Sequence, residues 1–161
     1  MTADEVKKTL GLVPHPREGG WFVRTWESAE FVAAGIGERR TSTAIYYLLE
    51  PGTFSEMHVL ESDEIFHHYM GGAVEMLQLL PDGTSRRVVI GKDLERGESP
   101  QVVVPRGVWQ GSRLLVEEGW ALLGCTVSPG FEFADYRSAS AEELCVKWPG
   151  ERKMIEKLTR S

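Results

Sequence analysis

The chain alternates short apolar segments with turn-forming residues over most of its length. From residue 21 to residue 128, runs rich in Val, Ile, Leu and aromatic residues are separated by Gly, Pro and Asp, a pattern typical of short strands. Turn residues at 71–72, 81–83 and 117–119 indicate hairpins. We therefore predict strands over residues 21–26, 41–50, 54–60, 64–70, 73–80, 85–90, 101–105, 109–116 and 119–128.

Strands this close together in sequence favour antiparallel pairing in a sandwich or barrel. The two ends of the chain instead predict short helices. Thr2 with Glu5, and Ser140 with Glu143, have the spacing of capping boxes, in which paired side chains satisfy free amides at a helix start. We expect one all-β domain over residues 1–161, with a barrel over about residues 20–128 and the helices outside it.

Composition narrows the classes of partner. Hydrophobic residues make up 42% of the 161 residues and charged residues 26%, which is typical of a globular domain. Eighteen basic residues against 24 acidic ones give a formal net charge of -6. Because an acidic surface repels phosphate backbones and anionic lipids, we expect neither nucleic-acid nor membrane binding.

The same sequence predicts a cytoplasmic protein. The first ten residues have no signal-peptide core, and the chain has no apolar run long enough to span a bilayer. Its two cysteines, Cys125 and Cys145, are too few for a disulfide framework and lack the spacing of a thiolate metal cluster. Both are expected to be reduced and packed in the interior.

The segment between Gly52 and Gly71 holds three of the four histidines in the chain. On a regular strand, Glu64, Phe66 and His68 share one face, and the residues between them point the other way. A carboxylate and an imidazole that point into a barrel can form either a metal site or a general acid–base pair.

These residues carry a resemblance to the cupin superfamily. Gly52, His58, Glu64 and Gly71 fall on the glycine, histidine, glutamate and glycine positions of the first cupin motif, while Leu60 replaces its second histidine.

Pro105 and Gly107 match the start of the second cupin motif, but Gln110 replaces its histidine and Leu114 its asparagine. A metal site of the usual cupin type has three histidines and a glutamate. Here the ligand set would be His58, Glu64 and the weak amide oxygen of Gln110. We therefore expect either no cofactor or a weakly held divalent metal.

The chain looks most similar to one branch, the fifth cupin domain family, long catalogued as a domain of unknown function. The segments that carry this likeness are 14–16, 18–20, 42–46, 62–64 with His67, 101–110, 124–127 and 129–135. The resemblance implies a small jelly-roll barrel that is usually a homodimer. Five tryptophans and six phenylalanines support aromatic-rich dimer contacts, contributed partly by the N-terminal region.

The candidate catalytic residues are His58, as a general base, and Glu64, which would accept a hydrogen bond from the imidazole or transfer a proton itself. Tyr46 or Tyr47 would be the opposing acid if its side chain faces inward. A buried structural pair is the alternative for His58 and Glu64. The candidate ligand-binding residues are Arg24, Tyr46, Phe66, His68, Gln101, Trp109 and Gln110.

The sequence thus predicts an enzyme of the isomerase or epimerase type, acting on a polar sugar- or nucleotide-like metabolite by acid–base proton transfer. A non-catalytic barrel that binds a small metabolite is the alternative. A metal-dependent dioxygenase is a third possibility, weakened because Leu60 and Gln110 stand at histidine positions.

Overall fold

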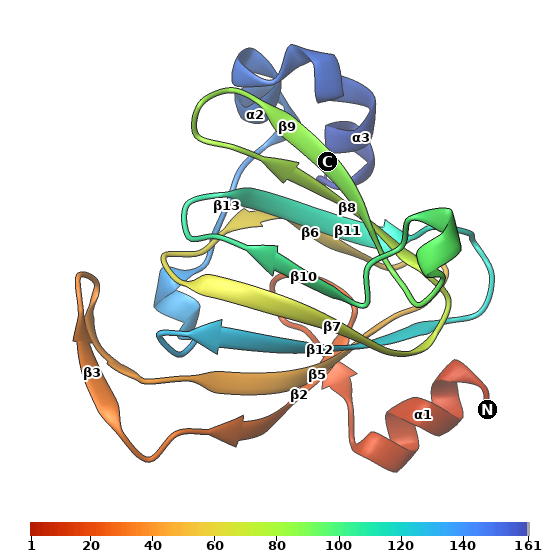
Figure 1. Ribbon diagram of the computed structural model, residues 1–161, viewed down its shortest axis with the longest axis horizontal. Helices are drawn as coiled ribbons and strands as arrows, with labels where there is room; N and C mark the ends of the chain where they lie inside the picture. The colour runs from red at the N-terminus through yellow and green to blue at the C-terminus, as the bar shows by residue number, and fades with distance from the viewer. Residues whose placement is uncertain (161) are drawn as a thin grey trace.

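A computed structural model describes residues 1–160, and its body consists of two antiparallel sheets that face each other (Figure 1). One sheet has six strands in the order β1-β2-β5-β12-β7-β10, and the other has five in the order β13-β6-β11-β8-β9. The six strands are β1 (Val13–Pro14), β2 (Trp21–Glu27), β5 (Thr43–Leu49), β7 (Asp63–Gly71), β10 (Gln101–Val104) and β12 (Ala121–Ser128). The five strands are β6 (Phe54–Val59), β8 (Val74–Leu79), β9 (Ser85–Ile90), β11 (Trp109–Leu114) and β13 (Arg137–Ser138).

This architecture confirms the predicted all-β jelly-roll barrel. Every predicted strand is present, with ends that differ from the prediction by at most two residues. A further hairpin, β3 (Phe31–Ala34) with β4 (Gly37–Arg40), stands away from the two sheets (Figure 1). The sequence did not predict it because its residues show no clear alternation, and Phe31 and Val32 are exposed.

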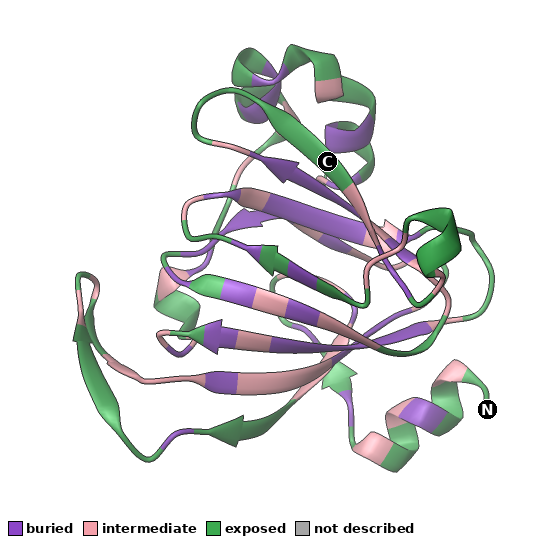
Figure 2. Ribbon diagram, in the orientation of Figure 1, coloured by how far each residue is buried: buried purple, intermediate pink, exposed green. Residues whose placement is uncertain are grey.

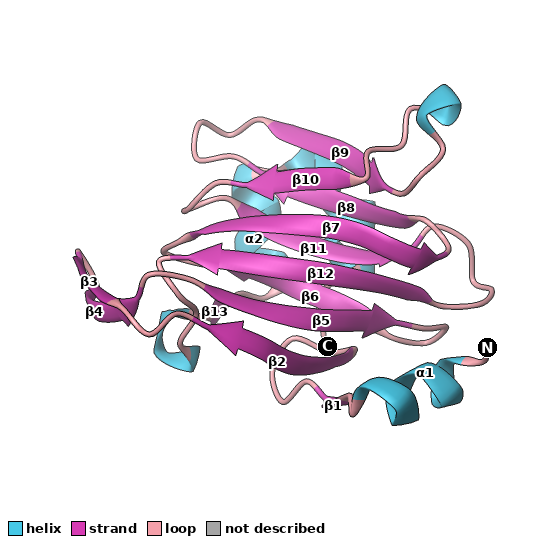
Figure 3. Ribbon diagram, turned by 60° about the horizontal axis from the view of Figure 1, so that its bottom comes forward, coloured by secondary structure: helices cyan, strands magenta, loops and turns pink. Residues whose placement is uncertain are grey.

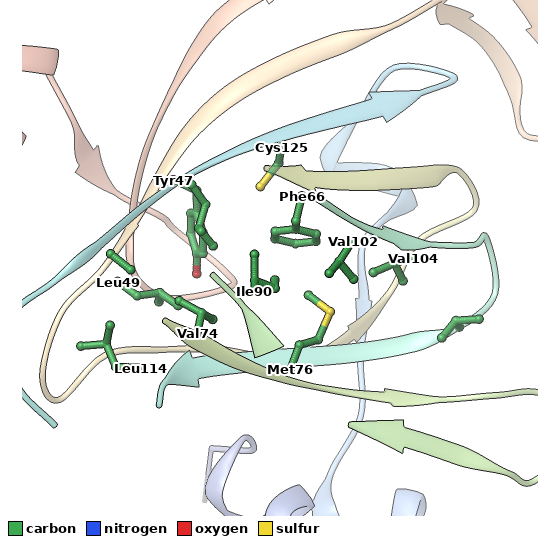
Figure 4. Close-up of a cluster of buried hydrophobic side chains, with 13 residues drawn as sticks. Tyr47, Leu49, Phe66, Val74, Met76, Ile90, Val102, Val104, Leu114 and Cys125 are labelled. Atoms are coloured by element: carbon green, nitrogen blue, oxygen red, sulfur yellow. The ribbon is translucent and has the colours of Figure 1, made fainter. Parts of the chain in front are cut away.

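The main core fills the space between the sheets. Inward-facing residues such as Tyr47, Phe66 and Met76 are at most 1% exposed, and they come from strands of both sheets (Figure 4). The alternation of β5 places Tyr47 and Leu49 in this core, whereas Leu48 packs on the outer side of the sheet. Apolar burial on the inner faces therefore holds the two sheets together.

Within residues 1–160, three short helices lie outside the barrel (Figure 1): α1 (Ala3–Leu10), α2 (Ala141–Lys147) and α3 (Arg152–Lys157). Figure 3 shows α1 beside β1, at the end of the six-stranded sheet. Both predicted capping boxes are formed, at Thr2 and at Ser140. Short 3-10 turns follow or separate other elements: η1 (Leu94–Arg96), η2 (Phe133–Asp135) and η3 (Pro149–Glu151). Among residues 1–160, none of the helices has the length and apolar composition needed to cross a membrane.

The helices cover the two sheets differently. Residues of α2 and α3, including Leu144 and Ile155, pack on Met57, Leu77 and Leu79 of the five-stranded sheet. The central strands of that sheet are consequently buried on both faces (Figure 2). Helix α1 packs only one end of the six-stranded sheet, around Leu48 and Leu122.

Candidate functional site

A cavity of about 230 Å³ lies within the barrel, between the loop at residues 15–20 and the loop at residues 129–133. Most of its wall is apolar, and a small number of polar side chains point into it, which is the usual composition of a small-molecule site. Its lining residues are His15, Glu18, Phe22, Arg24, Thr43, Ile45, Leu60, Glu64, Cys125, Val127, Phe131, Glu132 and Phe133.

Glu64 is the buried carboxyl group of this cavity. It lies near the start of β7, and its Oε2 accepts a hydrogen bond of 2.7 Å from Gln110 Nε2 of the opposite sheet. Burial raises the pKa of Glu64 to about 8, and the negative charge of Glu18 acts in the same direction. Near neutral pH the group therefore holds a proton, and because Oε2 accepts from Gln110, we assign that proton to Oε1.

Cys125 lies beside Glu64 in the cavity wall. It is 3% exposed. Burial raises the pKa of its thiol well above the ordinary value, and the neighbouring Glu64 carboxyl raises it further. The thiol is therefore protonated at neutral pH and is not an activated nucleophile.

Glu18 brings a second carboxyl group into the cavity. Its Oε1 accepts a hydrogen bond of 2.5 Å from Ser55 Oγ of β6. The His15 Nε2 atom lies 3.8 Å from Glu18 Oε2. The backbone N–H groups of Arg17 and Glu18 donate to His15 Nδ1, so the ring's proton sits on Nε2, facing the carboxylate. Burial also lowers the pKa of His15, which favours this neutral form.

Two glycines and one tyrosine place the loop that carries Glu18. Gly19 and Gly20 have positive φ values of 98° and 68°, a conformation that suits glycine. A Cβ atom on Gly20 would lie 2.8 Å from both Leu48 O and Tyr47 Oη, closer than a side chain allows. Tyr47 Oη donates a hydrogen bond of 2.8 Å to Gly19 O, which ties the loop to β5.

Arg24 and a cluster of rings form the entrance. Arg24 Nη2 donates to Phe131 O at 3.0 Å, and Nη1 donates to Glu27 Oε2 at 3.3 Å. The His15 ring contacts Phe22 and Phe133 with centroid distances of 4.6 and 5.9 Å. Phe131 and Phe133 pack edge to face at 5.2 Å. The entrance therefore combines one cationic group with an aromatic wall.

The loop at residues 129–135 is tied to the β3–β4 hairpin. Gly130 N donates to Arg40 O at 2.7 Å. The Arg39 guanidinium donates to both carboxylate oxygens of Asp135, at 2.8 and 2.7 Å. Phe131 N donates to Thr43 Oγ1 at 3.0 Å. These contacts fix one side of the cavity entrance.

Of the residues predicted for the site, Glu64 and Arg24 line this cavity, and Gln110 contacts it through its hydrogen bond to Glu64. His58 is buried opposite Gln110 in the pairing of β6 with β11, but it is not among the lining residues. Its Nδ1 lies 2.7 Å from Glu56 O, and its ring stacks on Tyr136. The amide of Gln110 supplies the hydrogen bond to Glu64 that was expected from the imidazole.

The alternation along β7 places Phe66 and His68 inside the barrel, as expected, but away from the cavity lining. Phe66 is 1% exposed and belongs to the main core. His68 pairs with the inward-facing Leu123, and its Nε2 lies 2.9 Å from Gly72 O.

Three predicted ligand-binding residues lie on outer surfaces because each alternates with an inward-facing neighbour. Tyr46 packs edge to face on Tyr69 outside the six-stranded sheet. The side chain of Gln101 on the edge strand β10 lies 3.3 Å from His67 Nδ1. Trp109 packs toward the C-terminal helices, with Arg137 over its ring.

Sequence reasoning did not assign Glu18, Phe131, Phe133 or His15 to the site, and it expected Cys125 only to be packed in the interior. The signal available in the sequence was the family-like pattern at residues 14–20 and 124–131. That pattern marked the two loops and the strand end, but it did not show that they meet at one cavity.

The donor set does not suit a metal site of the usual cupin type. Within residues 1–160, no group of three or more His, Cys, Asp and Glu side chains is arranged to hold a metal ion. Gln110 directs its amide N–H, rather than its oxygen, toward Glu64. Leu60, which lines the cavity, has no ligating atom.

Together, the two-sheet barrel and the motif residues around its cavity define a cupin-type protein. A model of the family described as "Cupin superfamily (DUF985)" matches residues 4–139, and the chain belongs to this family. The recognised resemblance is thereby confirmed.

Relatives support the same placement. The uncharacterized protein YML079W of Saccharomyces cerevisiae is 33% identical over 159 residues, which cover 90% of this chain and 79% of the yeast protein. Solved structures of a hypothetical protein from Leishmania major and of protein SO0799 from Shewanella oneidensis superpose with TM-scores of 0.93 and 0.91. Their identities are 32% and 34%. The first match covers 100% of both chains, and the second covers 99% of this chain and 98% of the other.

A more distant likeness concerns the fold alone. Oxalate decarboxylase of Bacillus subtilis superposes with a TM-score of 0.57 at 17% identity, over 91% of this chain and 37% of that one.

Proposed function

We propose that this protein is an enzyme of the isomerase or epimerase type, which moves protons on a small polar metabolite bound in the barrel cavity. The observation that carries the proposal is that two of the three carboxyl groups lining one mainly apolar cavity, Glu18 and Glu64, are half-buried and buried, while the third, Glu132, is exposed. Their surroundings differ, because Ser55 donates to Glu18 while Glu64 is buried with a pKa of about 8. Such a difference suits a base and an acid in one site.

In the proposed reaction, the Glu18 carboxylate removes a proton from the carbon next to a substrate carbonyl. Glu64 Oε1 donates its proton to the carbonyl oxygen, so that an enol forms without a net change of charge. Where the first carbon carries a hydroxyl, Glu18 then gives its proton to the former carbonyl carbon and that hydroxyl gives its proton to Glu64, so the carbonyl moves by one carbon. If the enol instead turns so that Glu18 returns the proton to the opposite face of the first carbon, and the enol proton goes back to Glu64, the epimer forms. The apolar walls limit water at the reacting atoms.

Glu18 takes the role of base that the sequence suggested for His58. It lines the cavity, whereas His58 is absent from the lining and its Nδ1 is held by Glu56 O. His58 would then support the site from behind Gln110, its cross-strand partner.

The test is exchange of carbon-bound hydrogen in heavy water, followed by proton NMR on a panel of sugars and sugar acids. We expect exchange with the parent protein and a loss of about 10²–10⁴-fold in Glu64→Gln and Glu18→Gln. Glu142→Gln, an exposed change on α2, is the matched control. A parent protein that binds a panel member without exchange would favour the non-catalytic metabolite-binding barrel. Unchanged rates in both folded variants would refute the assignment.

We also propose a homodimer formed through the outer face of the six-stranded sheet. The supporting observation is an apolar hollow at that face, next to α1, with Tyr69 and Met70 each 51% exposed. Apolar surface of this kind is favourable to bury between subunits. Sedimentation equilibrium at micromolar concentration is the test, with Tyr69→Lys as the disrupting variant. A monomeric parent protein would exclude the dimer.

A further inference from the structure

The size of the cavity limits the ligand. At about 230 Å³, it is smaller than the roughly 300–1,000 Å³ typical of sites for drug-sized ligands. One sugar ring or a short open chain fits this space. A nucleotide joined to a sugar would leave most of its atoms outside the barrel.

The positive charge at the cavity entrance favours a ligand with an anionic end group. Among the described residues that line the cavity, Arg24 is the one permanent cation, because the proton pattern and burial of His15 keep that ring neutral. Phe131 O and Glu27 each accept one hydrogen bond from the guanidinium, and the Arg24 side chain is 35% exposed. A guanidinium has five N–H donors, so others are free for a ligand.

A carboxylate fits this cation better than a phosphate. The planar fork of arginine can pair with either group, but its single charge balances one carboxylate. A phosphate ester carries about -1.5 to -2 charges at neutral pH. It would also face Glu18, Glu27 and Glu132, which lie in or beside the lining.

The remaining wall suits the body of a sugar. Glu18 and Glu64 can exchange hydrogen bonds with hydroxyl and carbonyl groups, since the carboxylate accepts and the protonated carboxyl donates. Phe22, Phe131 and Phe133 offer apolar surface to the C–H groups of a ring or chain. Hydroxyls near the carboxyls and a C–H face near the aromatic rings match the two kinds of surface on a sugar.

We infer that the substrate is a single sugar acid, such as a hexuronate or a ketoaldonate, whose carboxylate pairs with Arg24 while its hydroxyl and carbonyl carbons face Glu18 and Glu64. This inference rests on the proposed function, because it assigns the substrate class of the same site. It narrows that class from sugar- or nucleotide-like metabolites to one anionic sugar unit.

The experiment measures binding by calorimetry for hexuronates and ketoaldonates, each compared with its neutral parent sugar, glucose 6-phosphate and a nucleotide-linked glucuronate. We expect at least one sugar acid to bind more tightly than its neutral parent, the phosphate ester and the nucleotide-linked sugar. Arg24→Gln should weaken that binding by about 10- to 100-fold, the range for a lost charge-assisted pair. Arg24→Lys should restore only part of it.

Arg96→Gln is the matched control, because Arg96 lies outside the cavity lining and its side chain is 83% exposed. The inference is overturned if no sugar acid in the panel binds more tightly than its neutral parent, or if the phosphate ester or the nucleotide-linked sugar binds best. It is also overturned if Arg24→Gln, with an unchanged melting temperature, binds the sugar acid like the parent protein. Tight, Arg24-dependent binding without hydrogen exchange would instead retain the substrate class and reject the proton-transfer reaction.

Discussion

Gln110 donates its side-chain amide to Glu64 Oε2 at 2.7 Å, from the sheet opposite the one that carries the glutamate. This contact partly offsets the cost of burying the carboxyl group, since a buried polar group without a hydrogen bond is destabilising. Burial is still the larger effect, and it raises the pKa of Glu64 to about 8. The protein therefore keeps a protonated acid in the barrel under conditions where an exposed glutamate is ionised.

The first prediction concerns stability and pH. In the unfolded chain Glu64 loses its proton near its ordinary pKa of 4.5, but in the folded protein near 8. Its contribution to stability is therefore fully present below about pH 4.5, declines as the pH rises toward 8, and is constant above that. Glu64→Gln should remove this pH-dependent decline in the free energy of unfolding, which is on the order of a few kcal/mol. Urea unfolding of both proteins from pH 5 to pH 9 measures it, and parallel curves would contradict the raised pKa.

The second prediction concerns activity and pH. If Glu64 is the acid, exchange of substrate hydrogen needs its protonated form, so kcat/KM should fall by about tenfold per pH unit above pH 8. Gln110→Leu removes the hydrogen bond that favours the ionised form. This variant should move the fall to higher pH. A profile that stays level to pH 10 would exclude Glu64 as the acid.

The third prediction concerns the loop that carries Glu18. Tyr47→Phe removes the hydroxyl that donates to Gly19 O. The variant should lose roughly 1–3 kcal/mol of stability and should also lose activity, because Glu18 is no longer held in place. Ser140→Ala is the control: it removes the cap of α2 and should cost about 0.5–2 kcal/mol, with activity unchanged. If Tyr47→Phe were as active as Ser140→Ala and the parent protein, the Tyr47 hydroxyl would not be needed to position Glu18.

The fourth prediction concerns metal. Leu60→His combined with Gln110→His would supply the two imidazoles that stand at those motif positions in metal-binding cupins. We expect the double variant to retain nearly stoichiometric divalent metal through gel filtration, while the parent protein retains far less. Elemental analysis checks this difference. If the parent protein retained metal as tightly, the conclusion that its residues do not suit a cupin-type metal site would be wrong, and the dioxygenase alternative would return.

Local patterns in the sequence were sufficient to predict most of the fold. The β-branched runs marked the strands, and Thr2 and Ser140 marked two helix starts. The β3–β4 hairpin was missed because its side chains are largely exposed, so no buried face imposes alternation on residues 31–40. Strand pairing could be inferred as antiparallel, but the order of strands depends on contacts between distant segments.

The candidate site was predictable only in part, for the same reason. Glu64 follows from its motif position and from alternation along one strand. Alternation along β5 also shows that Tyr46 and Tyr47 point to opposite faces of the sheet. Which of the two points inward is known only once one residue of the strand has been located in the structure. Glu18 belongs to an irregular loop, so its place in the same cavity as Glu64 depends on Gly19, Gly20 and the long-range hydrogen bond from Tyr47 to Gly19.

The unequal cover of the two sheets has a consequence for hydrogen exchange. Strands β6, β8 and β11 lie between the barrel core and the layer of α2 and α3, so their amides open only with the loss of both layers. The six-stranded sheet has helical cover at one end only. We expect the amides on the edge strand β10, and on the part of β2 beyond its short pairing with β1, to exchange through local opening, well before those of the sandwiched strands. The sheet that carries Gln110 would thus be the slow-exchanging side of the barrel, and the sheet that carries Arg24 and the strand residues of the cavity lining the more adaptable one.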